Sequence, residues 1–549
     1  NIEVLSSKTS LELHTALPTS LDEFENFFID ANTNQLKNQN LFKRRILGLT
    51  SYFRSAQEQL MPKYNKDVDF KVIKIPMSDY QFGVYEQARI EERKLERSNR
   101  KKKKKQVKEN VYEDTVSTYR IFSRAFCNFV FPNENPRPMP DKEKDLGKVL
   151  KEDADEDLLD AISAEERINN PDGPFETEDI RILENDDTQD SSYKERIKNA
   201  LDFLKENAST YLSKDGLLTY SPKFLNMLEN IQDENYIGLH MIYSQFRTLE
   251  GIGILKLILE ENGFTQFKIK KNEAGIWNVN IKNEDKGKPT FALYTGTEDA
   301  EEKEIIRNIY NSDWEKVPVS IVSDLSLISS NNYYGEIIKV LMISASGAEG
   351  ISLKNVRYVH ITEPYWHPVR VEQVIGRARR ICSHHKLLLE ERTVEVFLYL
   401  MKFTEQQLEG ENAVELKLND GSKFDDKIPV TSDETLYEIS SIKEKINKEI
   451  LTAVKESSID CSLYTKGEKN EKLNCFSFGK SNPSSFSFGP SLNDNEVDAI
   501  SEINEKKINF EVKEIDLEID GIKKKFAMDP KTKEIYDFDD LTEFVVMRD

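Results

Sequence analysis

Two arginines near the end of a predicted helix are the residues best suited to chemistry. Arg377 and Arg380 close a helical pattern over Val371–Arg379, and residues three apart share one helix face. Two guanidinium groups pointing the same way can stabilise the charge that develops on a phosphoryl group during its transfer. The pattern therefore predicts a phosphate or nucleotide site, and a basic surface helix is the structural alternative.

A stretch of small residues precedes this helix. It follows the apolar run Val340–Ile343 and extends from Ser344 to Gly350. Small residues after a strand let the backbone approach a ligand closely, and their N–H groups can hold phosphate oxygens. This segment is the second predicted phosphate-binding element.

Short apolar strands alternate with helical patterns from residue 237 to 400. The strands are predicted at Ile237–Tyr243, Phe291–Tyr294, Val340–Ile343, Tyr358–Ile361 and Val394–Leu400, and the helices at Leu249–Leu259, Glu298–Ile309 and Val371–Arg379. This order is typical of an α/β, doubly wound parallel sheet, where ligands bind beyond the carboxyl ends of the strands. Ser244, Thr295, Ser344 and Glu363 fall at those ends.

Three segments carry a resemblance to a known family. Residues 344–353 resemble motif V of superfamily two helicases and translocases, and residues 373–380 match their motif VI, Q-x-x-G-R-x-x-R. Between them, Glu363-x-x-Trp366-His367-Pro368 is similar to the D-x-x-W-N-P stretch of Swi/Snf-type ATPases. In order and spacing the chain most resembles the Swi/Snf-like helicases of large nucleocytoplasmic DNA viruses, which implies a RecA-like C-terminal helicase lobe.

The resemblance also implies roles for individual residues. The catalytic residues would be Arg377 and Arg380, with Arg380 as the arginine finger; the nucleotide would contact Glu349, Gly350 and Gln373; and nucleic acid would contact Ser244, Gln245, Thr295, Gly296, Ser344, Ser346 and Gly347. The implied cofactors are ATP and Mg²⁺, and no metal ligand is expected here. Arg379, Val371 and Ser352 depart from the residues usual in the Swi/Snf family, which bears on coupling rather than on the fold.

The ATP-binding parts of an N-terminal lobe are not found. Gly479-Lys480-Ser481 resembles the end of a phosphate loop, but Asn474 stands where the first glycine is required. Residues 153–157 are acidic but follow no predicted strand. Because the chain also begins with Asn, we expect a fragment of a longer reading frame whose N-terminal lobe lies upstream.

Five regions are predicted along the chain. They are a helical tail of lobe one at 1–60, an inter-lobe linker and helical protrusion at 61–131, an acidic disordered insert at 132–191, the RecA-like domain at 192–405, and a charged helical and linker extension with a small β-element at 406–549. Residues 151–190 hold sixteen carboxylates and three Lys or Arg, so −13 of the net charge of −21 is local. The acidic total therefore does not exclude a nucleic-acid partner. Six positive residues at 100–105 favour a solvated tip, with phosphate binding or a nuclear address as alternatives.

The four cysteines, Cys127, Cys382, Cys461 and Cys475, form no C-x-x-C pair and are predicted to be reduced thiols of an intracellular protein. Zinc held through Cys461 and Cys475 is the alternative. No apolar run reaches the ~18–20 residues of a membrane span, so no membrane partner is expected. The location could be a viral factory, the virion, or the host cytoplasm or nucleus.

The sequence as a whole predicts the C-terminal motor lobe of an ATP-dependent helicase or translocase, inactive by itself. Its expected partners are nucleic acid, DNA in preference to RNA, the missing N-terminal lobe and viral transcription machinery. A non-catalytic module that docks on nucleic acid or a polymerase is the alternative. Intact Gln373, Arg377 and Arg380 favour the motor, since a docking module does not need them.

Overall fold

The computed structural model describes residues 16–31, 33–51, 60–103, 120–138, 190–295, 298–344, 350–409, 414–425, 427–461, 473–478, 498–499, 513–519, 522–528, 530 and 535–537. The chain divides into two compact units. One combines residues 1–54 with 445–549, and the other contains residues 55–444. The predicted acidic insert and the tip at Lys104 and Lys105 lie mostly outside the described residues.

The larger unit is built on a parallel sheet of seven strands in the order β3-β11-β10-β4-β9-β8-β5. The strands are β3 (Phe70–Pro76), β4 (Leu239–Tyr243), β5 (Thr265–Gln266), β8 (Thr290–Tyr294), β9 (Val340–Ile343), β10 (Val356–Ile361) and β11 (Glu395–Lys402). This arrangement confirms the predicted α/β, RecA-like, doubly wound fold.

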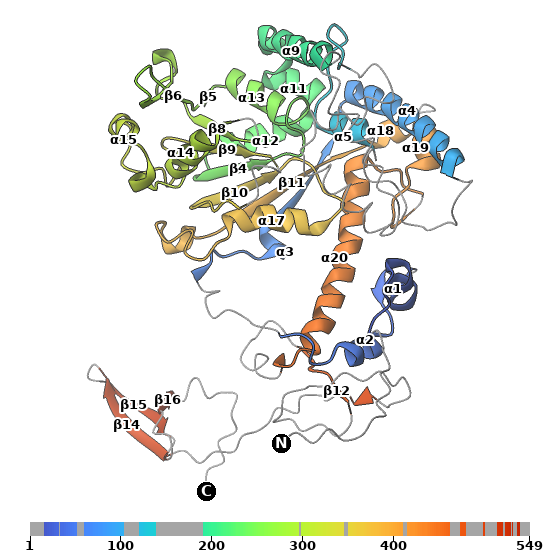
Figure 1. Ribbon diagram of the computed structural model, residues 1–549, viewed down its shortest axis with the longest axis vertical. Coiled ribbons are helices and arrows are strands. Elements are labelled where there is room, and N and C mark those ends of the chain that lie inside the picture. The colour runs from blue at the N-terminus through green and yellow to red at the C-terminus, as the bar shows by residue number, and fades with distance from the viewer. Residues whose placement is uncertain are drawn as a thin grey trace, which may run out of the picture. The chain divides into compact units, whose positions relative to one another are not determined.

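Helices cover both faces of the sheet (Figure 1). One face carries α4 (Asp79–Lys103), α9 (Asp190–Glu206), α11 (Lys214–Tyr220), α12 (Pro222–Gln232) and α13 (Ile252–Glu261), and the other carries α14 (Ala300–Tyr310), α15 (Val319–Leu325) and α17 (Pro368–Ala378). Successive strand residues alternate between the two cores: Met342 packs with the first set and Leu341 with the second. Strands buried on both faces explain why the sequence showed continuous apolar runs.

The sheet extends beyond the predicted domain boundary at residue 192. Strand β3 comes from the predicted linker and pairs in parallel with β11 along its full length. Strand β3 lies at the edge of the sheet and pairs with β11 alone. An edge position is less completely buried than a central one, which fits the alternation of apolar and polar residues in Phe70–Pro76. The linker region thus completes the sheet, and α5 (Ile121–Asn128) packs against α4.

Two smaller β-structures lie outside the seven-stranded sheet. One is an antiparallel hairpin of β6 (Ile269–Lys271) and β7 (Trp277–Val279). The predicted C-terminal β-element is a three-stranded sheet of β14 (Lys513–Ile519), β15 (Ile522–Met528) and β16 (Ile535–Asp537).

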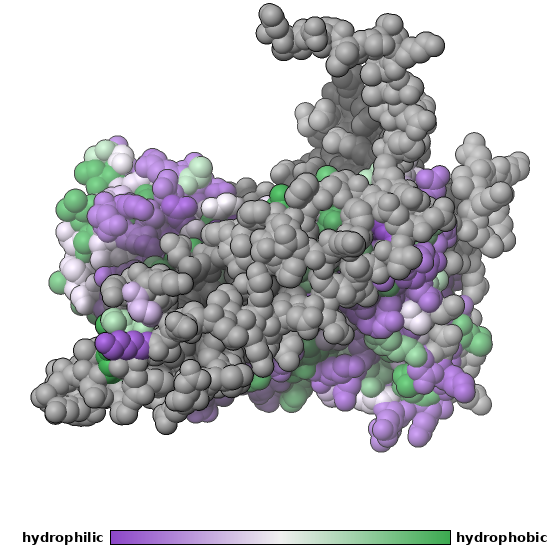
Figure 2. Space-filling model, turned by 90° about the horizontal axis from the view of Figure 1, so that it is seen from below, coloured by the Kyte–Doolittle hydropathy of each residue, from purple (hydrophilic) through white to green (hydrophobic). Residues whose placement is uncertain are grey.

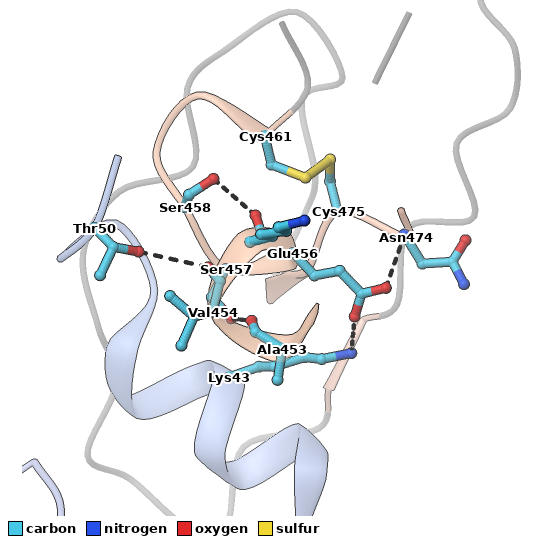
Figure 3. The surroundings of a disulfide bond; sticks show 11 residues. Lys43, Thr50, Ala453, Val454, Glu456, Ser457, Ser458, Cys461, Asn474 and Cys475 are labelled. Atoms are coloured by element: carbon cyan, nitrogen blue, oxygen red, sulfur yellow. Dashed lines mark hydrogen bonds and ion pairs between the residues drawn. A yellow bond between two sulfur atoms is a disulfide. The ribbon is translucent and has the colours of Figure 1, made fainter. Parts of the chain in front are cut away.

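The smaller unit contains α1 (Leu21–Phe28), α2 (Gln39–Ile46) and the second half of α20 (Ser432–Glu456) around a core of Phe28, Phe42, Ile46 and Ala453. Figure 3 shows a disulfide between Cys461 and Cys475 beside this core. The prediction that all four cysteines are reduced thiols is therefore wrong for this pair, because the fold brings the two Cα atoms to 5.8 Å. With both thiols in the bond, the zinc alternative also fails.

The surface of the described residues mixes hydrophilic and hydrophobic side chains, and in Figure 2 the hydrophobic ones are scattered among hydrophilic neighbours. None of the described helices is both long enough and apolar enough to cross a membrane.

A buried charge cluster ties α4 to the segment before α20. Asp420, at 1% exposure, accepts hydrogen bonds from three arginines, Arg89, Arg93 and Arg120. The bonds from Arg89 to the two carboxylate oxygens measure 3.1 and 2.9 Å. The arginines hold the pKa of Asp420 below its usual range against the opposing effect of burial.

We expect Asp420→Asn to lower the free energy of unfolding by about 3–5 kcal/mol, because it removes the buried carboxylate that three buried guanidinium groups share. Urea unfolding followed by circular dichroism measures the change. Glu284→Gln is the control, since Glu284 pairs with Lys282 at the surface and such pairs contribute at most about 1 kcal/mol. Equal stability of the two variants would contradict a structural role for the cluster.

Two buried histidines form a hydrogen-bonded chain across the sheet. His240 Nδ1 lies 3.0 Å from His360 Nε2, and His360 Nδ1 lies 2.8 Å from the Tyr399 hydroxyl, which also accepts from Asn230. Burial lowers the pKa of His360 to about 3 and holds the pKa of His240 well below its usual range. Both rings are therefore neutral in the folded chain near neutral pH.

The histidine chain predicts a loss of stability in acid. An unfolded histidine takes up its proton near pH 6.5, so from about pH 6.5 downward the unfolded chain binds more protons and the free energy of unfolding falls. His360→Gln removes one of the histidines that take up a proton on unfolding. We therefore expect the slope of the free energy of unfolding against pH to fall by about 1.4 kcal/mol per pH unit. Urea midpoints between about pH 4 and 7 measure this slope. An unchanged slope in His360→Gln, or an equal change in the exposed control His385→Gln, would refute the explanation.

Candidate nucleotide and nucleic-acid site

The winding of the sheet creates a crevice at the end of β4. From β4 the chain goes to β5 and returns through β8 to β9 on one side, then continues to β10 on the other. Reversal of the strand order opens a crevice beyond the carboxyl ends of the strands, which is where ligands bind in open α/β sheets. Ser244, Ser344 and Glu363 follow the three strands at this point.

Helix α17 begins beside this crevice. His367 caps it, its Nδ1 accepting from the Val369 N–H at 3.2 Å, and Pro368 occupies the first turn. The helix presents an exposed Gln373 and a half-buried Arg377. The Leu353 N–H donates to the Arg377 carbonyl at 3.2 Å, which joins the segment after β9 to the end of α17.

Arg380 does not share a helix face with Arg377, so that part of the prediction is wrong. The helix ends at Ala378, and Arg379 is already its C-cap with φ −95° and ψ 82°. Arg379 instead places its guanidinium 4.7 Å from the centroid of the Tyr64 ring. Arg380 lies beyond the helix with an exposed side chain, while its N–H donates to Ser383 Oγ.

Gly350 is exposed and adopts φ +71°, a left-handed conformation that favours glycine. No atom lies within 4 Å of the position that a Cβ would take. The backbone here is therefore accessible from solvent, as a nucleotide contact requires. Glu349, Ser346, Gly347 and Gly296 lie outside the described residues.

Glu363 lies inside the protein rather than on the rim of the crevice. Its carboxylate is 1% exposed and accepts from Ser244 Oγ at 2.6 Å, from the Gln245 N–H at 2.9 Å and from Asn128 Nδ2 at 2.6 Å. Burial raises the pKa of this carboxyl group, and the hydrogen bonds oppose the rise. The site thus contains a buried acceptor that gathers the ends of β4 and β10 and helix α5.

Ser244 and Gln245, which the resemblance assigned to contacts with a nucleic-acid strand, are buried. The Gln245 side chain accepts from Arg124 at 2.6 Å, and the Ser244 N–H donates to the Ile343 carbonyl. Their polar groups are engaged inside the protein. Thr295 and Ser344 are also buried, and the Thr295 N–H and hydroxyl both donate to Glu298.

A second set of buried polar residues was not identified from the sequence. Lys223 Nζ donates to Asn128 Oδ1 at 2.9 Å, to the Thr362 carbonyl at 3.2 Å and to Asp433 Oδ2 at 2.6 Å. Lys223 and Asp433 are 210 residues apart, and no local pattern marks them. Asn128 ends α5, which also carries Ser123 and Arg124, so its polarity alone does not set it apart.

Two lysines connect α20 to the region of α17: Lys443 of α20 itself, and Lys66, which lies between α17 and α20. Lys443 lies 4.0 Å above the Trp366 ring centroid. Lys66 donates to Glu372 of α17 at 2.8 Å and also pairs with Glu444. These contacts fix the helix that carries Gln373 and Arg377.

The side chains around α17 fit phosphate oxygens but not a metal ion. Gln373 and Arg380 are exposed at or just beyond α17, and Arg377 lies between them. Amide and guanidinium groups donate hydrogen bonds to phosphoryl oxygens. Within the described part of the chain no group of three or more His, Cys, Asp or Glu could hold a metal. The donors present thus suit a nucleoside triphosphate, and a Mg²⁺ ion would need ligands from elsewhere.

Comparison with known proteins agrees with this chemistry. Residues 264–382 match the helicase conserved C-terminal domain, which contains the segment after β9, the Trp-His-Pro stretch and α17. The matched region includes the residues in which the sequence resembles motifs V and VI of superfamily two helicases.

Two viral proteins are similar to most of the chain. The chain is 29% identical over 515 residues to "Putative ATP-dependent RNA helicase R350" of Acanthamoeba polyphaga mimivirus, covering 88% of this chain and 55% of that protein. It is 26% identical over 468 residues to "Termination factor NPH-I homolog" of African swine fever virus, covering 81% and 54%. The chain spans about half the length of the curated relatives it matches. Among solved structures, the C-terminal part of the Fun30 ATPase domain aligns with 71% of this chain and 99% of its own at 14% identity, with a TM-score of 0.32.

We expect Glu363→Gln to destabilise the larger unit by about 1–3 kcal/mol, because the new amide brings two N–H groups to a buried position already crowded with donors. Urea unfolding measures the loss. Glu390→Gln, at an exposed position, is the control and should unfold like the parent chain. If Glu363→Gln also unfolds like the parent, Glu363 does not organise the crevice.

Proposed function

We propose that this chain is the C-terminal motor lobe of an ATP-dependent helicase or translocase of the Swi/Snf-like type. The observation that carries the proposal is the set of hydrogen-bond donors on α17 and just beyond it: Gln373 and Arg377 on the helix, and Arg380 after its end. In this proposal ATP and Mg²⁺ are bound mainly by an N-terminal lobe upstream of Asn1, which the donors of α17 face. Without that lobe the chain does not hydrolyse ATP.

Arg380 is the proposed arginine finger. Its side chain is exposed and its backbone N–H is held by Ser383 Oγ, so the guanidinium is free to reach a phosphate across a cleft. Arg377 is half-buried in the last turn of α17, where it suits the positioning of a bound nucleotide. Gln373 and the exposed backbone at Gly350 supply further nucleotide contacts.

DNA is the proposed nucleic acid, and viral transcription is the proposed setting. A relative named as a termination factor supports the setting, and the resemblance to Swi/Snf-type proteins supports DNA. The mimivirus relative is named as an RNA helicase, so RNA is the competing substrate. Location within the virus or the infected cell stays a prediction.

The test is nucleic-acid-stimulated ATP hydrolysis by the full reading frame, with DNA and RNA compared side by side. Arg380→Ala is expected to lower kcat by about 10³–10⁵-fold, the contribution of an arginine finger, with little effect on nucleic-acid affinity. Residues 1–549 alone are expected to show no hydrolysis. Arg307→Ala, on α14 and paired with Glu304, is the matched control and should retain full activity.

Each other outcome is informative. Hydrolysis that survives Arg380→Ala would remove Arg380 as the finger. Stimulation of ATP hydrolysis by RNA but not by DNA would show that RNA, not DNA, is the nucleic-acid substrate. Absence of hydrolysis with every polymer, together with tight binding, would favour the non-catalytic docking module.

A further inference from the structure

A groove lies between α9 and α13 and has no part in the nucleotide site. Its volume is about 540 Å³. Its charged lining residues are Lys198, Asp202 and Lys205 on α9, with Arg247 and Lys256 on the other side. Among the described residues that line the groove, four are thus cations and one is a carboxylate, and most of the others are aliphatic.

None of these four cations makes a side-chain hydrogen bond or an ion pair within the described part of the chain. They are Lys198, Lys205, Arg247 and Lys256. Elsewhere on this acidic protein lysines find carboxylate partners readily, as Lys271 does with Glu301 and Lys354 with Asp313. Unpaired like charges around one groove repel one another unless an anion enters.

Lys256 is the lysine on which the repulsion between neighbouring cations is most evident. It is half-buried in the groove wall on α13, and burial lowers the pKa of its ammonium group, with Lys268 and Lys205 contributing in the same direction. Glu260 opposes the shift without forming an ion pair. A bound anion would relieve both the desolvation and the repulsion.

The groove reaches the carboxyl edge of the sheet. Thr295 follows β8, and Arg247 and Thr248 follow β4, at the edge where the nucleotide crevice also lies. On α9, Lys198 and Lys205 are seven residues apart, which places them on one helix face about 10 Å from each other. Two long, flexible lysine side chains on one helix face can each reach a phosphate of the same strand.

We propose that the groove between α9 and α13 binds the sugar–phosphate backbone of a nucleic-acid strand, with Lys198 and Lys205 of α9 as phosphate contacts. The inference rests on the proposed function for the identity of the ligand. It adds to that function two contact residues, Lys198 and Lys205 of α9, that lie outside the matched region 264–382 and outside the motifs named above. The aliphatic residues pack against the methylene groups of the lysine side chains. None of the described residues that line the groove is aromatic, so no ring among them can stack on a base, and contacts to phosphates alone are independent of base sequence.

The experiment measures equilibrium binding of residues 1–549 to a labelled DNA strand of about 20 nucleotides and to its duplex, between about 50 and 200 mM salt. Each lost phosphate contact makes the plot of log K against log salt shallower by about 0.7 for a single strand or 0.9 for a duplex. The double variant Lys198→Gln/Lys205→Gln is expected to be shallower by about 1.4 or 1.8. Asp202→Asn is expected to bind more tightly than the parent, because it removes the one carboxylate lining the groove.

The matched control is Lys286→Gln/Lys316→Gln, which removes two exposed lysines that do not line the groove. An equal change in both double variants would show general charge screening and overturn the proposal, and so would an unchanged slope in Lys198→Gln/Lys205→Gln. A peptide of the chain's own acidic sequence, residues 153–166, tests the other occupant. If this peptide binds the parent but not the Lys198/Lys205 variant while DNA binds both equally, the groove is a site for acidic polypeptide instead.

This readout is separate from ATP hydrolysis. If the full reading frame proves inactive but the salt slope changes as expected, the motor function fails and the groove assignment stands. If Arg380→Ala abolishes hydrolysis while the slope does not change, the motor function stands and the groove assignment fails.

Discussion

The buried carboxylate of Glu363 is the interaction on which the crevice depends. It accepts hydrogen bonds from Ser244, from the Gln245 backbone and from Asn128 at 2.6 to 2.9 Å. Removing a carboxylate from water is costly, and it is tolerated only where donors replace the water. The three donors therefore hold the ends of β4 and β10 and helix α5 in a single arrangement.

Buried polar residues and exposed donors have separate roles in this unit. Lys223, paired with Asp433 in the interior, ties α12 and the start of α20 to the network around Glu363. Gln373 and Arg380, by contrast, are exposed on α17 and just beyond it. A site that accepts phosphate oxygens from another lobe benefits from this division, because a fixed scaffold reduces the freedom lost when the ligand is bound.

The hydrophobic pattern of the sequence was sufficient to predict the central strands of the sheet. Val340–Ile343 was predicted with its observed bounds, and the strand at 358–361 was only two residues short at its start. A strand buried on both faces leaves a continuous apolar run that is easily recognised. Edges were harder: β3 completes the sheet from beyond a long insertion, and nothing local indicates which distant strand it joins.

The order of motifs in the sequence determined the fold class and the chemistry of α17, because apolar strand patterns and the types of phosphate-binding side chains are local properties. Tertiary structure decided which polar residues face the ligand. It buried Ser244, Gln245 and Glu363, placed Arg380 beyond the helix, and joined Cys461 to Cys475. Burial and pairing depend on residues far apart in the chain, such as Lys223 and Asp433, so they follow only from the packing of the whole unit.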